Sequence, residues 1–144
     1  MSTRYWLMKS EPASYGWDRL VEDGGTLWDG VRNHRAKMNL QAMREGEQAF
    51  FYHSVTGKEI VGIVEIAEAG LSDPKATDRE WPAVRVRPVR ALERPVTLAE
   101  IKGDPALKDI ELVRQSRLSV AEIRPAEWER ILALSAGSTG GTAA

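Results

Sequence analysis

Two strand-like runs at the centre of the chain constrain its fold most strongly. Residues 48–53 and 59–69 are rich in aromatic and β-branched side chains, and a five-residue segment, 54–58, separates them. Such runs favour strands, and a short connection that contains glycine favours a hairpin between them. We therefore expect a β-hairpin over this part of the chain.

Two further segments have the pattern of strands. Residues 5–8 are apolar, and Pro12 follows, which removes a backbone donor and favours the end of a strand. Residues 82–95 alternate apolar and polar positions, as in a half-exposed strand. The positions expected on the buried side of that strand are Val84, Val86 and Val89.

Two helices are predicted in the first third of the chain. We expect Ser14 to cap a helix that runs to about Glu22 and is stopped by Gly24. Residues 33–44 have a helical stripe of apolar side chains, with Gly46 positioned as the C-terminal stop.

Two more helices are predicted near the C-terminus. Thr97 and Glu100 have the spacing of a capping box, and Pro125 precedes an amphipathic stretch. Helices that interrupt a small sheet, without alternating with every strand, make the predicted fold class α+β.

The size of the chain suits one domain. It has 144 residues, of which 42% are hydrophobic, so folding buries roughly two-thirds of the surface of the unfolded chain. We expect this domain to cover residues 1–134. The last ten residues, 135–144, are small and polar, and we expect a disordered glycine-, serine- and threonine-rich tail there.

Composition also excludes several classes of site. The chain has no cysteine and two histidines, which argues against disulfides, thiolate zinc sites and all-imidazole metal centres. We expect neither a metal nor a cofactor. The sequence has no signal-peptide pattern and no run of about 20 apolar residues. We expect a cytoplasmic monomer that does not bind membranes, with nucleoid association as an alternative location.

The distribution of charge matters more than its sum. A net charge of -1 argues against coating nucleic acid through bulk positive charge. Residues 30–44, however, contain four basic and no acidic side chains, and residues 85–94 form a second basic run. These runs indicate either a nucleic-acid footprint or solvated surface faces.

The segment from Trp28 to Asn33, WDGVRN, has an unusual mixture of side chains. One interpretation is structural, with Trp28 in the core, a turn at Asp29 and Gly30, and Asn33 as a helix cap. The other makes the segment a pocket wall, because a helix N-terminus offers free N–H donors and an amide can read a base edge. Both can hold together.

Two polar segments predict no functional site when each is taken alone. Strand alternation places Phe51 and His53 on one face, and Phe50, Tyr52 and Ser54 on the other. A single histidine in such a run is more often structural than catalytic. Residues 114–119, RQSRLS, are typical of a capped turn when taken alone.

Six blocks in this order resemble the EVE domain family of the PUA-like superfamily. The blocks are YWLMKSEP (5–12), WDGVRN (28–33), FFYHS (50–54), VGIVE (61–65), RPVTLAEIK (94–102) and LVRQSRLSV (112–120). The resemblance implies a PUA-like β pseudo-barrel of mixed strands, flanked by several short helices. It also implies binding of DNA or RNA that carries a modified cytosine, with that base extruded into a pocket.

The resemblance places a set of residues around this pocket. By position they are Lys9, Ser10, Glu11, Pro12, Trp28, Val31, Arg32, Asn33, Tyr52, His53, Ser54, Arg117, Leu118 and Ser119. Trp28 and Tyr52 suit stacking on a base, and the Asn33 amide suits its hydrogen-bonding edge. The cations expected to contact phosphates are Arg32, Arg35, Lys37 and Arg117.

Two other functions compete with a reader of 5-methylcytosine or an oxidised form. The first is a small hydrolase of a modified nucleobase or nucleoside, because Lys9 and Glu11 share a strand face and can supply a base and an acid. A structural ion pair at a strand end also explains these two residues, and it is the explanation that we favour. The second is a protein-interaction module whose pocket has lost its ligand.

Overall fold

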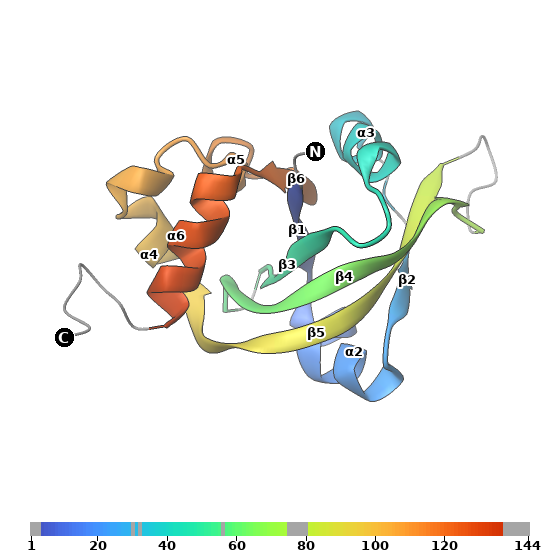
Figure 1. The fold of residues 1–144 in the computed structure, drawn as a ribbon, viewed down its shortest axis with the longest axis horizontal. Coiled ribbons are helices and arrows are strands. Elements are labelled where there is room, and N and C mark those ends of the chain that lie inside the picture. The colour runs from blue at the N-terminus through green and yellow to red at the C-terminus, as the bar shows by residue number, and fades with distance from the viewer. Residues whose placement is uncertain (1–3, 30, 32, 56, 75–80, 137–144) are drawn as a thin grey trace.

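The computed structural model describes residues 4–29, 31, 33–55, 57–74 and 81–136 (Figure 1). Its strands are β1 (Tyr5–Ser10), β2 (Thr26–Trp28), β3 (Gln48–His53), β4 (Glu59–Ser72), β5 (Pro82–Thr97) and β6 (Val120–Ile123). Its helices are α1 (Pro12–Tyr15), α2 (Trp17–Asp23), α3 (His34–Ala42), α4 (Leu98–Lys102), the short 3₁₀ helix η1 (Pro105–Leu107), α5 (Glu111–Arg114) and α6 (Pro125–Ser135). The expected α+β class is confirmed.

All these strands belong to one mixed six-stranded sheet, in the order β2-β5-β4-β3-β1-β6. The β3–β4 pair is the expected hairpin. β1 runs parallel to β3, and β6 pairs antiparallel with β1 on its other side. The carboxyl ends of β1 and β3 and the start of β6 therefore meet at the same end of the sheet.

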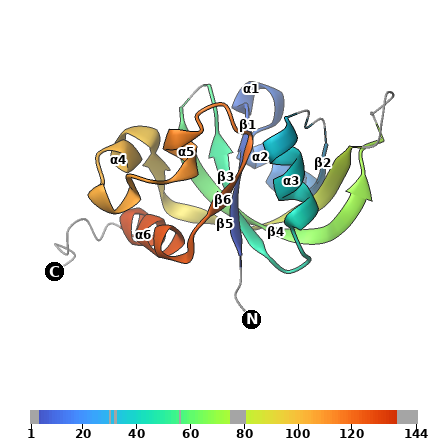
Figure 2. The same cartoon turned by 90° about the horizontal axis from the view of Figure 1, so that it is seen from above.

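The helices lie in two groups around this sheet. Figure 2 shows α4, α5 and α6 gathered at one side of the molecule and α2, α3 and β2 at the other, with β1 and β6 between them. No helix among the described residues is both long and apolar enough to cross a lipid bilayer.

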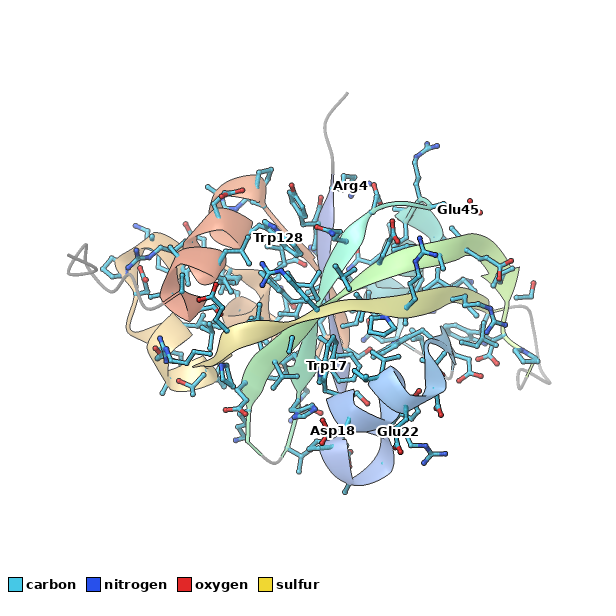
Figure 3. The ribbon with its side chains drawn as sticks, turned by 60° about the horizontal axis from the view of Figure 1, so that its bottom comes forward. Arg4, Trp17, Asp18, Glu22, Glu45 and Trp128 are labelled. Atoms are coloured by element: carbon cyan, nitrogen blue, oxygen red, sulfur yellow. The ribbon has the colours of Figure 1, made fainter. Side chains whose placement is uncertain are left out.

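Aromatic side chains fill the core on both faces of β3. On one face Phe50 stacks on Trp128 of α6, with ring centroids 4.0 Å apart, and Tyr5 stacks on Trp128 at 4.3 Å. On the other face Phe51 makes edge contacts with Trp17 of α2 at 5.6 Å and with Trp28 at 5.8 Å. Figure 3 shows Trp17 where α2 meets the sheet and Trp128 at the opposite side, beside α6.

The two longest strands extend beyond their predicted ends, to Ser72 and Thr97. Their pairing contains several register shifts, and both strands bend across the molecule (Figure 1). Val84 and Val86 are buried as expected, but Val89 is 45% exposed, so the inward orientation predicted for it is wrong. The physical reason is that side chains alternate with a period of two, which places Val89 on the face of Arg85 and Arg87 and opposite to Val84 and Val86. Val89 also lies at a register shift, between the pairs Pro88–Val64 and Arg90–Ile63.

The first predicted helix is in fact two helices. Ser14 lies inside α1, which begins at Pro12, so the cap predicted at Ser14 is wrong. Gly16 adopts an extended backbone and separates α1 from α2. The predicted stop at Gly24 is confirmed, because Gly24 has a left-handed φ of 74° and its N–H donates to the Leu20 carbonyl.

Asn33 caps α3 as predicted, and its Oδ1 accepts from the Ala36 N–H at 3.0 Å. The C-terminal stop predicted at Gly46 is wrong, because α3 ends earlier and Met43 is its C-cap. Gly46 instead takes a φ of 91° in the turn before β3, where its N–H donates to the Ile66 carbonyl at 2.9 Å. This bond anchors the turn to β4.

The C-terminal elements agree with the local signals. Thr97 and Glu100 form the expected capping box at α4. The predicted tail begins one residue inside α6, because Ser135 is buried and its Oγ accepts from the Arg94 N–H at 3.2 Å. The remainder of that predicted tail, residues 137–144, lies outside the described residues.

Candidate functional site

A pocket of about 860 Å³ opens at the end of the sheet where β1 and β3 terminate. The Ser54 N–H donates to the Ser10 carbonyl, and the Lys9 N–H donates to the Ser119 carbonyl, both at 2.9 Å. These bonds join the end of β1 to the end of β3 and to the start of β6. We call this cavity the strand-end pocket.

Half of the residues proposed from the sequence line the strand-end pocket. These are Lys9, Ser10, Glu11, Trp28, Ser54, Arg117 and Ser119. They come from four segments far apart in the chain. The pairing of β1 with β3 and β6 brings three of those segments together, and β2 supplies the fourth.

Lys9 is the half-buried cation of this pocket. Its Nζ donates to the Ser116 carbonyl at 3.0 Å and lies 5.9 Å from the centroid of the Tyr52 ring. Burial lowers the pKa of Lys9, because removal from water disfavours the ammonium form. Burial likewise raises the pKa of the Tyr52 phenol.

Ser10 ties α1 to the strand that precedes it. Its hydroxyl donates to the Tyr15 carbonyl at 2.6 Å. The Tyr15 hydroxyl in turn donates to the Asp23 carboxylate at 2.8 Å, so the first two helices are held together beside the pocket. Burial raises the pKa of Tyr15, and the hydrogen bond to Asp23 adds to that shift.

Trp28 supplies a partly exposed indole to the pocket wall. Its ring meets Phe51 edge-on at an interplanar angle of 89°, which fixes the orientation of the indole from behind. The structural interpretation of this tryptophan is confirmed in part, and its role in binding a ligand stays a prediction. It packs on the core, and it also faces the cavity.

His53 lies behind the pocket and is absent from the described lining residues. Its Nε2 accepts from the Trp17 N–H at 3.1 Å, at the start of α2. Burial lowers the pKa of His53, although Glu59 and Asp18 oppose the shift. The geometry indicates a residue that positions α2.

The other proposed residues also lie away from the described lining. Val31 and Leu118 are buried in the core, Asn33 caps α3, and Pro12 opens α1. Tyr52 lines a neighbouring cavity instead. Gly30 and Arg32 lie outside the described residues.

The structure adds lining residues that the sequence analysis did not assign to the site. They are Ser14, Tyr15, Thr26, Leu27, Asp29 and Ser116. Asp29 lies in the segment 28–33 and Ser116 in the segment 114–119, so the sequence motifs could have predicted that both residues belong to the site. The others depend on where α1 and β2 pack, for which no local pattern exists.

The basic side chains of residues 30–44, the first basic run, are only partly available to contact phosphate groups. Arg35 donates to Glu111 of α5 at 2.6 Å, and Lys37 lies 5.1 Å from the Trp81 ring centroid. Neither residue lines the strand-end pocket. Arg117 does line it, is exposed, and has no ion pair with any other described residue.

The second basic run is largely paired with acidic side chains, which favours a solvated surface face over a nucleic-acid footprint there. Three of its arginines face carboxylates on other segments. The pairs are Arg85 with Glu68 at 3.0 Å, Arg87 with Glu65 at 2.7 Å and Arg94 with Glu100 at 2.8 Å. Pairing with the neighbouring strand β4 and with α4 brings these acidic side chains opposite the arginines.

The chemistry of the strand-end pocket suits a planar polar ligand. It has an aromatic wall, several hydroxyl groups, the cations Lys9 and Arg117, and the carboxylates Glu11 and Asp29. Within the part of the chain that the structure describes, no group of histidine, aspartate or glutamate side chains is arranged to hold a metal ion.

The fold and pocket define an α+β domain of the PUA-like class with a candidate ligand site at the ends of its parallel strands. The sequence model of the EVE domain matches residues 4–134, and the chain therefore belongs to the EVE domain family.

Relatives match the chain over most of its length. Human thymocyte nuclear protein 1 is 34% identical over an alignment of 165 positions, which covers 90% of this chain and 73% of that protein. A crystal structure of a protein from Agrobacterium tumefaciens has a TM-score of 0.90 and 38% identity, over 92% of this chain and 93% of the other.

A third comparison includes a ligand. The crystal structure of human THYN1 protein in complex with DNA containing 5-methylcytosine has a TM-score of 0.84 and 32% identity to this chain. It covers 92% of this chain and 98% of the human one.

Proposed function

We propose that this protein binds nucleic acid and accommodates an extruded, modified cytosine in the strand-end pocket. One observation carries the proposal: a human protein with the same fold and 32% identity has been solved with DNA containing 5-methylcytosine. DNA and RNA are both within the proposal, and so are 5-methyl and oxidised forms of the base. The expected monomeric state and cytoplasmic location stay predictions.

The walls of the pocket support this function physically. A base that leaves its stack needs a new stacking partner, which Trp28 can provide. Stacking of a base on an aromatic side chain contributes about 1 to 3 kcal/mol. The hydroxyls of Ser10, Ser54 and Ser119 offer hydrogen bonds to the edge of the base.

The charges support contacts with the backbone. Arg117 lies at the pocket without an ion-pair partner among the described residues, so it is available to a phosphate. Such contacts add affinity without sequence preference. We expect binding to weaken as salt rises, because each phosphate contact releases counterions.

The selectivity for a methyl group alone is expected to be small. Burial of one methyl group contributes about 0.8 kcal/mol, which corresponds to roughly fourfold in affinity. A hydroxymethyl or carboxyl group can instead reach the ammonium of Lys9 or the guanidinium of Arg117, through stronger charge-assisted hydrogen bonds. Oxidised cytosine should therefore be preferred by a wider margin.

The test is a titration with matched DNA and RNA oligonucleotides that carry cytosine or its 5-methyl, 5-hydroxymethyl or 5-carboxyl form. We expect tighter binding of a modified base, and we expect Trp28→Leu to weaken that binding by about tenfold, because the stacking surface is removed. Leucine keeps an apolar side chain against Phe51. Exposed Met38 provides the control, and Met38→Ala should bind like the wild type.

Two results would contradict the proposal. One is equal affinity for all forms of the base. The other is a Trp28→Leu variant that is folded and retains wild-type affinity and preference.

A second function has a specific observation in its favour. Lys9 and Glu11 line the same pocket, and burial lowers the pKa of Lys9, which brings a neutral amine closer to neutral pH. Hydrolysis of a modified nucleobase or nucleoside is thus the alternative proposal. Hydrolysis of N4-acetylcytidine to cytidine and acetate, abolished in Lys9→Ala, would favour the hydrolase over the reader.

A further inference from the structure

A second cavity adjoins the strand-end pocket across Lys9. It has a volume of about 520 Å³, and Lys9, Ser54 and Ser116 line both cavities. The Lys9 side chain, held to the Ser116 carbonyl, therefore forms part of the boundary between them. We call this second space the lysine cavity.

The lysine cavity lies between the β3–β4 hairpin and α4. The Leu98 N–H at the start of α4 donates to the Lys58 carbonyl at 2.9 Å, which fixes one segment against the other. Lys58 and Lys102 are exposed and line the cavity together with Lys9. These three cations therefore come from β1, the hairpin and α4.

The charge of this cavity differs from that of its neighbour. No aspartate or glutamate is among its described lining residues, whereas Glu11 and Asp29 accompany the cations of the strand-end pocket. Glu100 and Asp104, each two residues from Lys102, pair with Arg94 and Arg130. Glu59, next to Lys58, is not among the described lining residues. The cavity thus favours an anion.

The remaining lining is apolar. Tyr52 and Leu112 are buried, Leu98 is partly buried, and Val55 is 65% exposed on the hairpin. Val55 also has a φ of 67°, which is rare for a β-branched residue. An apolar surface beside a group of lysines matches a ligand that has both an uncharged face and a phosphate.

We propose that the lysine cavity holds the nucleotide that adjoins the extruded base, with its phosphate at Lys58 and Lys102. This inference rests on the proposed function: the two cavities share Lys9, Ser54 and Ser116, so they lie side by side, and neighbouring nucleotides of one strand can occupy them. Lys9 then contacts the strand between the two nucleotides. The ligand class is a single-stranded di- or oligonucleotide segment rather than an isolated nucleoside.

The test compares ligands of increasing length. The probes are the nucleosides 5-methyl- and 5-carboxyl-deoxycytidine, their dinucleotides extended at the 5′ or the 3′ side, and the same dinucleotides with a neutral methylphosphonate linkage. The protein is the full chain, as wild type and as the double variant Lys58→Gln/Lys102→Gln. Glutamine removes the charge and keeps much of the stem. Lys108→Gln is the control, because Lys108 is exposed and lines neither cavity.

We expect the wild type to bind one of the two dinucleotides more tightly than the nucleoside, by on the order of tenfold. This gain should disappear in the double variant and with the methylphosphonate ligand, while both proteins bind the nucleoside equally. With a longer single strand, the double variant should reduce the salt slope by about 0.7 for each phosphate that it no longer neutralises.

Three outcomes overturn the inference, and they separate it from the proposed function. A base preference with no length gain, or with a gain that the double variant retains, refutes the lysine cavity and leaves the reader intact. Equal weakening of the nucleoside and the dinucleotide would place the two lysines at the base itself. Binding of an acidic peptide such as hexaglutamate, without binding of any nucleotide, would overturn both proposals.

Discussion

At the scale of single residues, His53 links the candidate site to the stability of the fold. Its neutral imidazole accepts the Trp17 N–H that begins α2, and protonation removes that acceptor. Burial holds the pKa of His53 below the ordinary value of 6.5. The folded state therefore binds this proton less readily than the unfolded chain does.

The sign of the pH effect follows from that lowered pKa. Above pH 6.5 the imidazole is neutral in both states, and the full contribution to stability is present. As the pH falls from 6.5 through the lower pKa of the folded state, the unfolded chain takes up more protons and the free energy of unfolding decreases. Urea unfolding at pH 5.5 and 7.5 measures this difference.

The matched variants make this prediction specific. His53→Gln should show a smaller decrease between the two pH values than the wild type, because a glutamine oxygen can accept from Trp17 and does not titrate. His34 is exposed and is the other histidine of the chain, so His34→Gln should keep the wild-type decrease. An undiminished decrease in His53→Gln would assign the effect to other groups.

At the scale of elements, the contact of α2 with β4 decides how the aromatic cluster beneath the pocket is built. Trp17 lies directly over Gly62, and a Cβ atom at residue 62 would stand 2.5 Å from the indole ring. The Trp17 indole therefore packs directly on the backbone of β4. The same indole contacts Phe51, which orients Trp28 in the pocket wall.

Gly62→Ala should consequently displace Trp17 and destabilise the protein. Overpacking of this kind typically costs about 1 to 3 kcal/mol. The destabilisation is measured as a lower midpoint in urea or a lower Tm. Gly103→Ala is the control, because its Cβ would meet the nearest atom at 3.5 Å and its φ of -85° suits any residue. Equal effects at the two positions would disprove the close packing of Trp17.

At the scale of the whole molecule, the sheet separates Trp128, which packs in the core, from Trp28, which also lines the candidate site. Phe50, Trp128 and Tyr5 pack between one face and α6. Phe51, Trp17 and Trp28 pack on the opposite face, and only Trp28 of these described residues lines the strand-end pocket. Stability and ligand binding should therefore respond to different tryptophans.

Trp128→Leu tests this separation. Removal of the indole that stacks on Phe50 and Tyr5 should lower the free energy of unfolding on the order of 2 kcal/mol. The folded fraction should bind the modified oligonucleotide with wild-type affinity, whereas Trp28→Leu should weaken binding. Scanning calorimetry measures the stability, and a binding titration at a temperature well below Tm measures the affinity. A large decrease of affinity in folded Trp128→Leu would contradict the separation.

Local patterns along the chain determined most of the secondary structure. The hairpin of β3 and β4, the Asn33 cap, the Gly24 stop and the Thr97 capping box all rest on interactions between residues close in sequence. Such interactions can be predicted because side-chain type and spacing contain all that they need. The six blocks of the chain also indicated its family, which the match over residues 4–134 supports.

The tertiary structure decided which polar residues share a cavity and which charges remain available. Arg85, Arg87 and Arg94 form a basic run in the sequence, but strand pairing and the packing of α4 bring carboxylates opposite them. Pairing of β1 with β3 likewise joins Lys9 to Ser54, although the two residues are far apart in the chain. A pattern of neighbouring residues contains no information on such distant partners, because their proximity depends on the order and register of the strands.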